Sequence, residues 1–266
     1  GVPESVLHLI IGGKDIGNEL TKFNELNGVA FTGSTAAAKS INLNLAKSEG
    51  PIKTLIAETG GQNAMFVDSS SLKEQVIDDV IKSAFYSSGQ RCSALRVVFI
   101  QEDIAQEYWE YLNEAMQEIK VGDPQKPSTD IGPIINKTSI SKLQDHVAKL
   151  KKAGKEFIET KGDFNKETFF MNPIAFKIDS IKEIDGEKFG PILHFISYKS
   201  SELDGLIDEV NATGFGLTMG VHSRVLDKAK QIFDKANVGN FYLNRDIVGA
   251  AVSYTHLTLP TTYHVE

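Results

Sequence analysis

The sequence has a single cysteine among its 266 residues, Cys92, which excludes both a disulfide framework and a cysteine-rich zinc site. Its six histidines show neither HxxxH nor HExxH spacing, so the sequence predicts no metal centre built on histidine. No apolar run approaches the roughly 18 residues that span a bilayer, and no signal peptide opens the chain. These absences predict a cytoplasmic protein without a membrane span.

Positive charge is also scarce. The chain has 35 acidic and 28 basic residues, so its net charge is −7. The densest basic group, Lys149 to Lys155, is typical of the solvated end of a helix, so the sequence predicts no nucleic-acid partner. A hydrophobic fraction of 41% is ordinary for a soluble protein with a sizeable core. At about 150 residues per domain, the length favours one large domain or two smaller ones.

The first sixty residues alternate short apolar runs with one helical pattern. We predict strands at Val6–Ile11, Val29–Thr32 and Thr54–Ala57, and a helix at Ala36–Ala46. A strand, a helix and a second strand within about thirty residues are typical of the βαβ unit of a parallel sheet.

A second pattern follows Gly60 and Gly61. Ser71 and Glu74 form a predicted capping box, after which apolar residues at helical spacing predict a helix that ends near Gly89. A buried strand is predicted at Leu95–Ile100. Further helices are predicted at 103–119, 138–152, 201–211 and 225–236, and further strands at Pro191–Tyr198 and Asn240–Leu243.

Cys92 lies in the turn Gly89–Ala94, between the predicted helix and the predicted strand. A lone cysteine is most often a small buried hydrophobic residue. The loop setting and the neighbouring Arg91 favour the other interpretation, because a positive charge and solvent near the sulfur promote the reactive thiolate.

Three other features each have a purely structural interpretation beside the functional one. Glu58 ends a predicted strand before two glycines, where ligands gather in open parallel sheets, but a solvated loop carboxylate has the same pattern. The turn Gly33–Thr35 precedes a helix and either receives a phosphate or simply caps the helix. The segment Glu187–Pro191 is, taken alone, a turn before a strand.

The order and spacing of these features favour the functional interpretation of each. The sequence resembles the aldehyde dehydrogenase superfamily in a series of three motifs. They are Glu-x-Gly-Gly, then Gly-Gln-x-Cys with its cysteine 34 residues after the glutamate, and then Glu-x-Phe-Gly-Pro. Within this superfamily the sequence resembles the L-glutamate γ-semialdehyde (pyrroline-5-carboxylate) dehydrogenases, above all the dehydrogenase half of the bifunctional bacterial proline-utilisation group. The resemblance covers Gly1 to about Val252. It is carried by Phe31–Thr35, Ala57–Ala64, Gly89–Arg96, Thr129–Pro133, Gly214–Thr218 and Val238–Arg245.

The resemblance implies a role for each motif. Cys92 would be the nucleophile and would form a thiohemiacetal and then a thioester, which Glu58 would hydrolyse as the general base. The cofactor would be NAD. Gly33 and Ser34 would contact its pyrophosphate, Glu187 its nicotinamide ribose and Phe189 its nicotinamide ring.

The resemblance also implies the substrate, the fold and the partners. Ser93 would help to bind the α-carboxylate of L-glutamate γ-semialdehyde, which would be oxidised to L-glutamate in proline catabolism. The fold would be α/β: the C-terminal part of a Rossmann-like NAD-binding domain at 1–60, a catalytic domain of aldehyde dehydrogenase type at 61–252, and a tail unlike the family at 253–266. The parent would be a homo-oligomer, fused in some relatives to a flavin-dependent proline dehydrogenase domain.

Two departures from the family pattern leave alternatives open. The asparagine of the oxyanion hole and the lysine of the adenosine ribose would lie before Gly1, and an unrelated stretch from Ser253 replaces the loop that grips the substrate. We therefore expect an internal segment of about half a subunit that is inactive on its own. The alternatives are an aldehyde dehydrogenase of other specificity and a catalytically silent piece.

Overall fold

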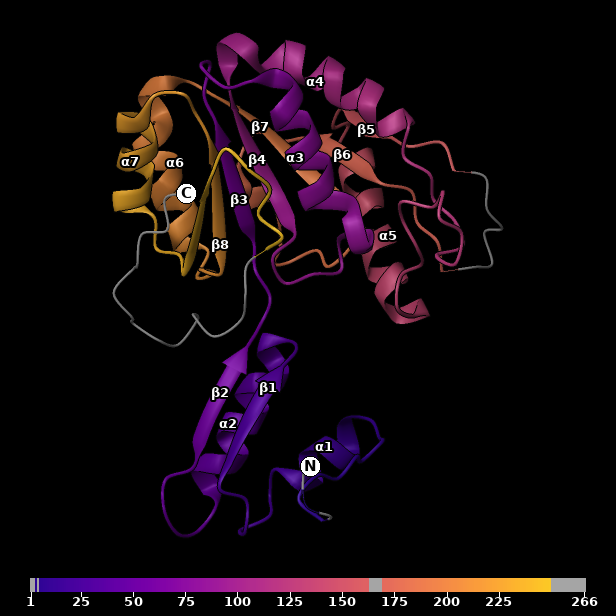
Figure 1. Ribbon diagram of the computed structural model, residues 1–266, viewed down its shortest axis with the longest axis vertical. Coiled ribbons are helices and arrows are strands. Elements are labelled where there is room, and N and C mark those ends of the chain that lie inside the picture. Colours follow the sequence, from indigo (N-terminus) through magenta and orange to yellow (C-terminus); the bar gives the residue numbers. More distant parts are fainter. Residues whose placement is uncertain (1–2, 4, 163–168, 250–266) are drawn as a thin grey trace. The chain divides into compact units, whose positions relative to one another are not determined.

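The chain forms two units, Gly1–Thr59 and Gly60–Glu266, in the computed structural model (Figure 1). The structure describes residues 3, 5–162 and 169–249. The assignment of functions to residues 1–60, 61–252 and 253–266 stays a prediction, and the last of these segments lies outside the described residues.

A strand–helix–strand element makes up most of the first unit. Its two strands pair in parallel along their whole length, and the helix between them begins at Ser34, whose side-chain oxygen accepts a hydrogen bond from the N–H of Ala37. The predicted βαβ unit is therefore confirmed. The elements of this unit are α1 (Lys14–Leu20), β1 (Gly28–Thr32), α2 (Thr35–Lys47) and β2 (Thr54–Glu58).

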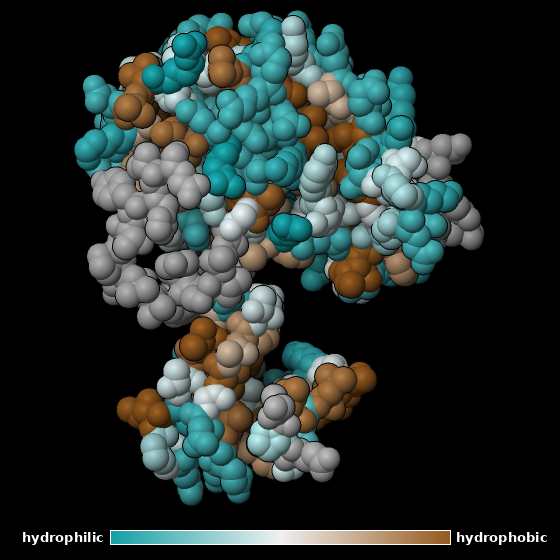
Figure 2. Space-filling view, in the orientation of Figure 1, coloured by the Kyte–Doolittle hydropathy of each residue, from teal (hydrophilic) through white to brown (hydrophobic). Residues whose placement is uncertain are grey.

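The strand predicted at Val6–Ile11 is wrong. These residues form no helix or strand, and their large apolar side chains are exposed, with Leu9 at 87%. An apolar run becomes a strand only where a neighbouring strand satisfies its backbone, and within the described residues the sheet of this unit consists of β1 and β2. Figure 2 shows hydrophobic side chains on the surface of this unit.

A seven-stranded sheet organises the second unit. The strand order is β5-β6-β7-β4-β3-β8-β9, and every neighbouring pair is parallel except β5 and β6. The bounds are β3 (Asn63–Val67), β4 (Leu95–Gln101), β5 (Phe157–Glu159), β6 (Ile174–Lys177), β7 (Ile192–Tyr198), β8 (Thr218–His222) and β9 (Asn240–Leu243).

Helices cover both faces of this sheet. Alternate residues of β3 point to opposite faces: Phe66 stacks on Phe99 at 4.6 Å on the face covered by α5, α6 and α7, whereas Met65 lies in the core under α3 and α4. Figure 1 shows α3 and α4 in front of the sheet. The bounds are α3 (Lys73–Phe85), α4 (Glu102–Gln117), α5 (Lys137–Lys152), α6 (Leu203–Ala212) and α7 (Leu226–Lys235).

Most later elements match their predictions within two residues at each end, but the predicted capping box is wrong. Helix α3 begins after Leu72, and no side chain caps it. The Ser71 hydroxyl instead donates to the carbonyl of Asp68 at 2.7 Å and lies 2.8 Å from the Tyr108 hydroxyl. Among the described residues, none of the helices is both long and apolar enough to cross a membrane.

Candidate active site

The Cys92 turn connects the end of α3 to the start of β4. Ser87, Ser88 and Gly89 all have positive φ angles, of 56°, 57° and 63°. This backbone conformation is uncommon for serine, and such residues cluster at functional sites. A Cβ at Gly89 would overlap the carbonyl oxygen of Gly190, so only glycine fits there. Cys92 itself is half-buried at the end of this turn.

Asn63, the first residue of β3, fixes the far side of the turn. Its side-chain amide donates to the carbonyl of Cys92 at 2.7 Å and to that of Ala94 at 2.8 Å. Gly61 must lack a side chain, because a Cβ there would overlap the Asn63 amide. The second glycine of Glu-x-Gly-Gly therefore makes room for the side chain that holds the nucleophile turn.

Gln90 and Ser88 attach the same turn to the end of the Thr129–Pro133 motif and to Ile135 just after it. The Gln90 amide donates to the carbonyl of Pro133 at 3.0 Å and accepts from the N–H of Ile135 at 2.8 Å. The Ser88 hydroxyl donates to the carbonyl of Gly132 at 2.7 Å. Two motifs that lie about forty residues apart are thus joined by side-chain hydrogen bonds.

Glu187 approaches the turn from the loop before β7. Its Oε1 accepts from the N–H of Gly61 at 3.1 Å and from Arg96 Nη2 at 3.3 Å, and a Cβ at Gly60 would overlap its Oε2. Burial raises the pKa of Glu187, and the Arg96 guanidinium opposes that shift. Phe189 is 41% exposed, and its ring lies 5.3 Å from the centre of the same guanidinium.

Ser93 is buried directly after the nucleophile. Its hydroxyl donates to the carbonyl of Val248 at 3.2 Å, in the segment that follows β9. The predicted contact of this hydroxyl with a substrate carboxylate stays a prediction, because in this structure the hydroxyl binds a backbone carbonyl.

The other predicted site residues belong to the first unit. Glu58 is the last residue of β2 and is buried, so it is not the solvated loop carboxylate of the plainer reading. Its backbone carbonyl accepts from the N–H of Gly33 at 3.0 Å. Glu58, Gly33 and Ser34 are therefore gathered at the carboxyl ends of β1 and β2.

Neither Asn63 nor Arg96 is among the predicted site residues, although both lie in the motifs that carry the resemblance. Arg96 is 1% exposed and forms the cationic centre of the turn. Arg91, which the sequence favoured for that position, is exposed, and its Nε donates to the hydroxyl of Ser87 at 3.0 Å. The available signal was a charged residue inside the otherwise apolar strand predicted at Leu95–Ile100.

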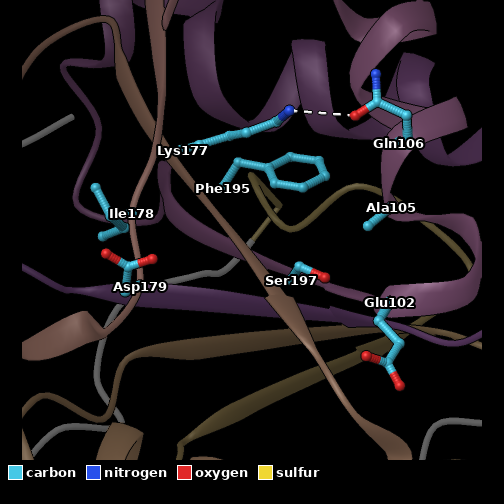
Figure 3. Close-up of a pocket in the computed structure, with 8 residues that line it drawn as sticks. All are labelled: Glu102, Ala105, Gln106, Lys177, Ile178, Asp179, Phe195 and Ser197. Atoms are coloured by element: carbon cyan, nitrogen blue, oxygen red, sulfur yellow. Dashed lines mark hydrogen bonds between the residues drawn. The ribbon is translucent and has the colours of Figure 1, made fainter. Parts of the chain in front are cut away.

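A cavity of about 380 Å³ lies elsewhere in the second unit (Figure 3). It lies near the carboxyl ends of β6 and β7, whereas Cys92 precedes the amino end of β4. Its one lysine, Lys177, is held by Glu156 at 2.9 Å and by Gln106 at 3.3 Å. The lining residues are Glu102, Ala105, Gln106, Lys177, Ile178, Asp179, Phe195 and Ser197, and none of them is a predicted site residue.

Comparison with known proteins identifies the family. The model of the aldehyde dehydrogenase family matches residues 1–256, and the chain belongs to that family. The chain is similar to the bifunctional protein PutA of Klebsiella aerogenes, with 42% identity over 262 residues, which are 95% of this chain and 20% of that protein. A 1-pyrroline-5-carboxylate dehydrogenase from a Geobacillus strain is 35% identical over 96% of this chain and 50% of its own length.

Solved structures agree with this assignment. A crystal structure of a proline utilization A (PutA) mutant from Bradyrhizobium japonicum gives a TM-score of 0.91 at 43% identity, over 95% of this chain and 26% of that chain. The predicted fold class is therefore confirmed. The chain spans between a fifth and a half of the length of the curated relatives named above.

Proposed function

We propose that this chain is part of an enzyme that oxidises L-glutamate γ-semialdehyde to L-glutamate with NAD. The family membership supports aldehyde oxidation, and the names of the relatives, PutA and 1-pyrroline-5-carboxylate dehydrogenase, support this substrate. The observation that carries the proposal is the Cys92 turn. The sole thiol of the chain is half-buried in a loop that hydrogen bonds connect to Asn63, to Pro133 and to Arg96.

In the proposed reaction, the Cys92 thiolate attacks the aldehyde carbon and forms a thiohemiacetal. Loss of a hydride from that carbon leaves a thioester on Cys92, and a water molecule deprotonated by Glu58 hydrolyses it to the carboxylate. Within the described residues the N–H of Cys92 donates no hydrogen bond, so it is available to the oxygen that becomes negative during attack.

The residues of each unit fit NAD. Helix α2 has no acidic residue in its first turn, and its free N–H groups beside Ser34 suit a pyrophosphate. In the described part of the chain, Glu187 Oε2 accepts no hydrogen bond, which leaves it for a ribose hydroxyl, and the half-exposed Phe189 offers an apolar ring. NAD, when bound, supplies the hydride acceptor.

The names of the relatives also support a place in a longer bifunctional protein. A flavin-dependent proline dehydrogenase partner domain, a homo-oligomeric parent and a cytoplasmic location stay predictions.

The proposal is tested with the Cys92→Ala and Glu58→Gln variants of the natural full-length protein. Cys92→Ala should release no NADH from the semialdehyde. Glu58→Gln should give a burst of one NADH per site followed by turnover about 10² to 10⁴-fold slower, because only deacylation needs the base.

Two results would refute these roles. If hydride transfer itself slows in Glu58→Gln and no burst appears, Glu58 activates Cys92 instead. If other aldehydes of similar size react better than the semialdehyde, the enzyme has another specificity.

A further inference from the structure

Arg96, the second residue of β4, is a deeply buried cation beside the Cys92 turn. Its Nη1 donates to the carbonyls of Gly89 at 2.7 Å and Gly190 at 3.2 Å. Its Nη2 donates to the carbonyl of Arg91 at 3.0 Å and to Glu187 Oε1 at 3.3 Å. Two of these acceptors belong to the nucleophile turn, so this guanidinium fixes the backbone on both sides of Gln90 and directly before Cys92.

The charge of Arg96 is incompletely balanced. Burial lowers its pKa, and the negative charges of Glu187 and of an ionised Cys92 act in the opposite direction. A guanidinium stays protonated even so, because it is the most basic side chain and does not lose its proton in proteins. Its Nε–H is buried and has no acceptor among the described residues. A buried cation with one carboxylate partner attracts any further negative charge that develops beside it.

Two buried histidines, His194 and His146, form a hydrogen-bonded chain that ends at the backbone carbonyl of Arg96. His194 Nδ1 lies 2.9 Å from the Arg96 carbonyl, which can only accept, so this nitrogen carries the proton. Burial lowers the pKa of His194 to about 3 and that of His146 to about 4, so both rings are neutral at pH 7. His194 Nε2 must then accept from the N–H of His146 Nε2, 2.9 Å away. The pair therefore supports Arg96 without adding positive charge.

We propose that Arg96 is a positioning residue for the nucleophile: its hydrogen bonds fix the turn from Gly89 to Cys92, and its buried charge stabilises the Cys92 thiolate. Glu187, which shares the guanidinium, weakens that stabilisation. The inference rests on the proposed function in one respect, because it takes Cys92 to be the nucleophile.

The opposite charges of Arg96 and Glu187 give a test with two signs. Iodoacetamide is uncharged and Cys92 is the only cysteine, so the alkylation rate of the chain reports this thiol alone. At pH 7 we expect Arg96→Met to react about tenfold more slowly than the unchanged chain, because less thiolate is present. Glu187→Gln keeps an oxygen acceptor for Gly61 and Arg96 but loses its charge, so it should react several-fold faster.

The pH profile separates charge from structure. Above about pH 9.5, where the free thiol is largely ionised, the rates of the variants should converge if Arg96 acts on ionisation. A distorted turn would change the plateau rate instead. Arg96→Lys keeps a cation but loses the planar set of donors that holds the carbonyls of Gly89 and Arg91, so its rate at pH 7 should lie between those of Arg96→Met and the unchanged chain. The exposed Arg224, substituted by Met, is the control for losing one positive charge, and its rate should not change.

Three results would overturn the inference: an unchanged profile in Arg96→Met, an equal slowing in Arg91→Met, or changes of the same sign in Arg96→Met and Glu187→Gln. If Arg96→Met does not fold, Arg96→Lys and Glu187→Gln decide between the same outcomes. Alkylation needs neither NAD nor aldehyde. A full-length protein that shows this dependence but oxidises no semialdehyde would therefore refute the proposed function and leave this inference intact.

Discussion

Acid should destabilise the second unit through the buried pair His146 and His194. Burial, with a smaller contribution from the charge of the nearby Lys188, lowers the pKa of these imidazoles to about 4 and about 3. In the unfolded chain each has a pKa of about 6.5 and takes up a proton as the pH falls below that value. The stability that the neutral pair contributes is thus fully present above pH 6.5 and is lost as the pH falls towards 4.

The size of the effect follows from the distance between pH 5 and the unfolded pKa. At 1.36 kcal/mol per pH unit, 1.5 units correspond to about 2 kcal/mol for each imidazole, or about 4 kcal/mol for the pair. The free energy of unfolding can be measured by guanidinium titration, because the single tryptophan, Trp109, lies in the core of this unit against Phe195.

The matched comparison is the double variant His146→Gln with His194→Gln, which has no imidazole to protonate at this position. The charged residues near His146, including Asp185 and Lys149, are the same in both proteins. Between pH 7.5 and pH 5 the unchanged chain should lose about 4 kcal/mol more than the double variant. Equal losses would show that the buried pair does not control acid stability.

Four further substitutions have expected outcomes in the same unfolding assay. Asn63→Leu should cost about 2 to 4 kcal/mol, because two buried carbonyls lose their donor, and a cost below 1 kcal/mol would show that water replaces the amide. Gly89→Ala should destabilise the unit strongly and slow Cys92 alkylation, because a Cβ there meets the Gly190 carbonyl at a positive φ. Gly205→Ala, on an open helix face, should instead stabilise by about 0.5 to 1 kcal/mol. If Gly89→Ala were the more stable of the two, the positive φ and the close contact at Gly89 would not matter. Asp79→Asn should stabilise by about 2 to 3 kcal/mol at pH 7.5 and by roughly half of that at pH 5, because burial raises the pKa of Asp79 from 3.8 to about 6 and the cost of its charged form builds up between these two values. A gain that does not change with pH would refute this.

Helices were easier to predict from the sequence than strands. The long helices α3, α4 and α5 carry apolar residues at helical spacing on one buried face, and this periodicity is visible in any window of the sequence. Strands β3 and β8 were missed because all five residues of each are buried. A strand covered on both faces has no alternating pattern and resembles any short apolar run.

The candidate site was predicted unevenly for a related reason. Cys92 and Glu58 stand out because their residue types carry chemistry and their spacing matches a family. Asn63 and Arg96 act through carbonyls that lie far away in the sequence or on the other side of a turn. No pattern of residue types indicates which carbonyls a buried amide or guanidinium will reach, so their contribution emerges only when β3 and β4 are placed side by side.

The motifs of the second unit are best understood as parts of one packed junction rather than as separate sites. A Cβ at Gly60 would overlap the carboxylate of Glu187, and a Cβ at Gly89 would overlap the carbonyl of Gly190, so glycines of two motifs make room for atoms of the third. Arg96 then bonds to both loops. Because each motif occupies space that another leaves empty, we expect a change in one loop to displace the others. The same physical constraint explains why the half-buried thiol of Cys92 lies on a backbone whose carbonyls are held by Asn63 and Arg96.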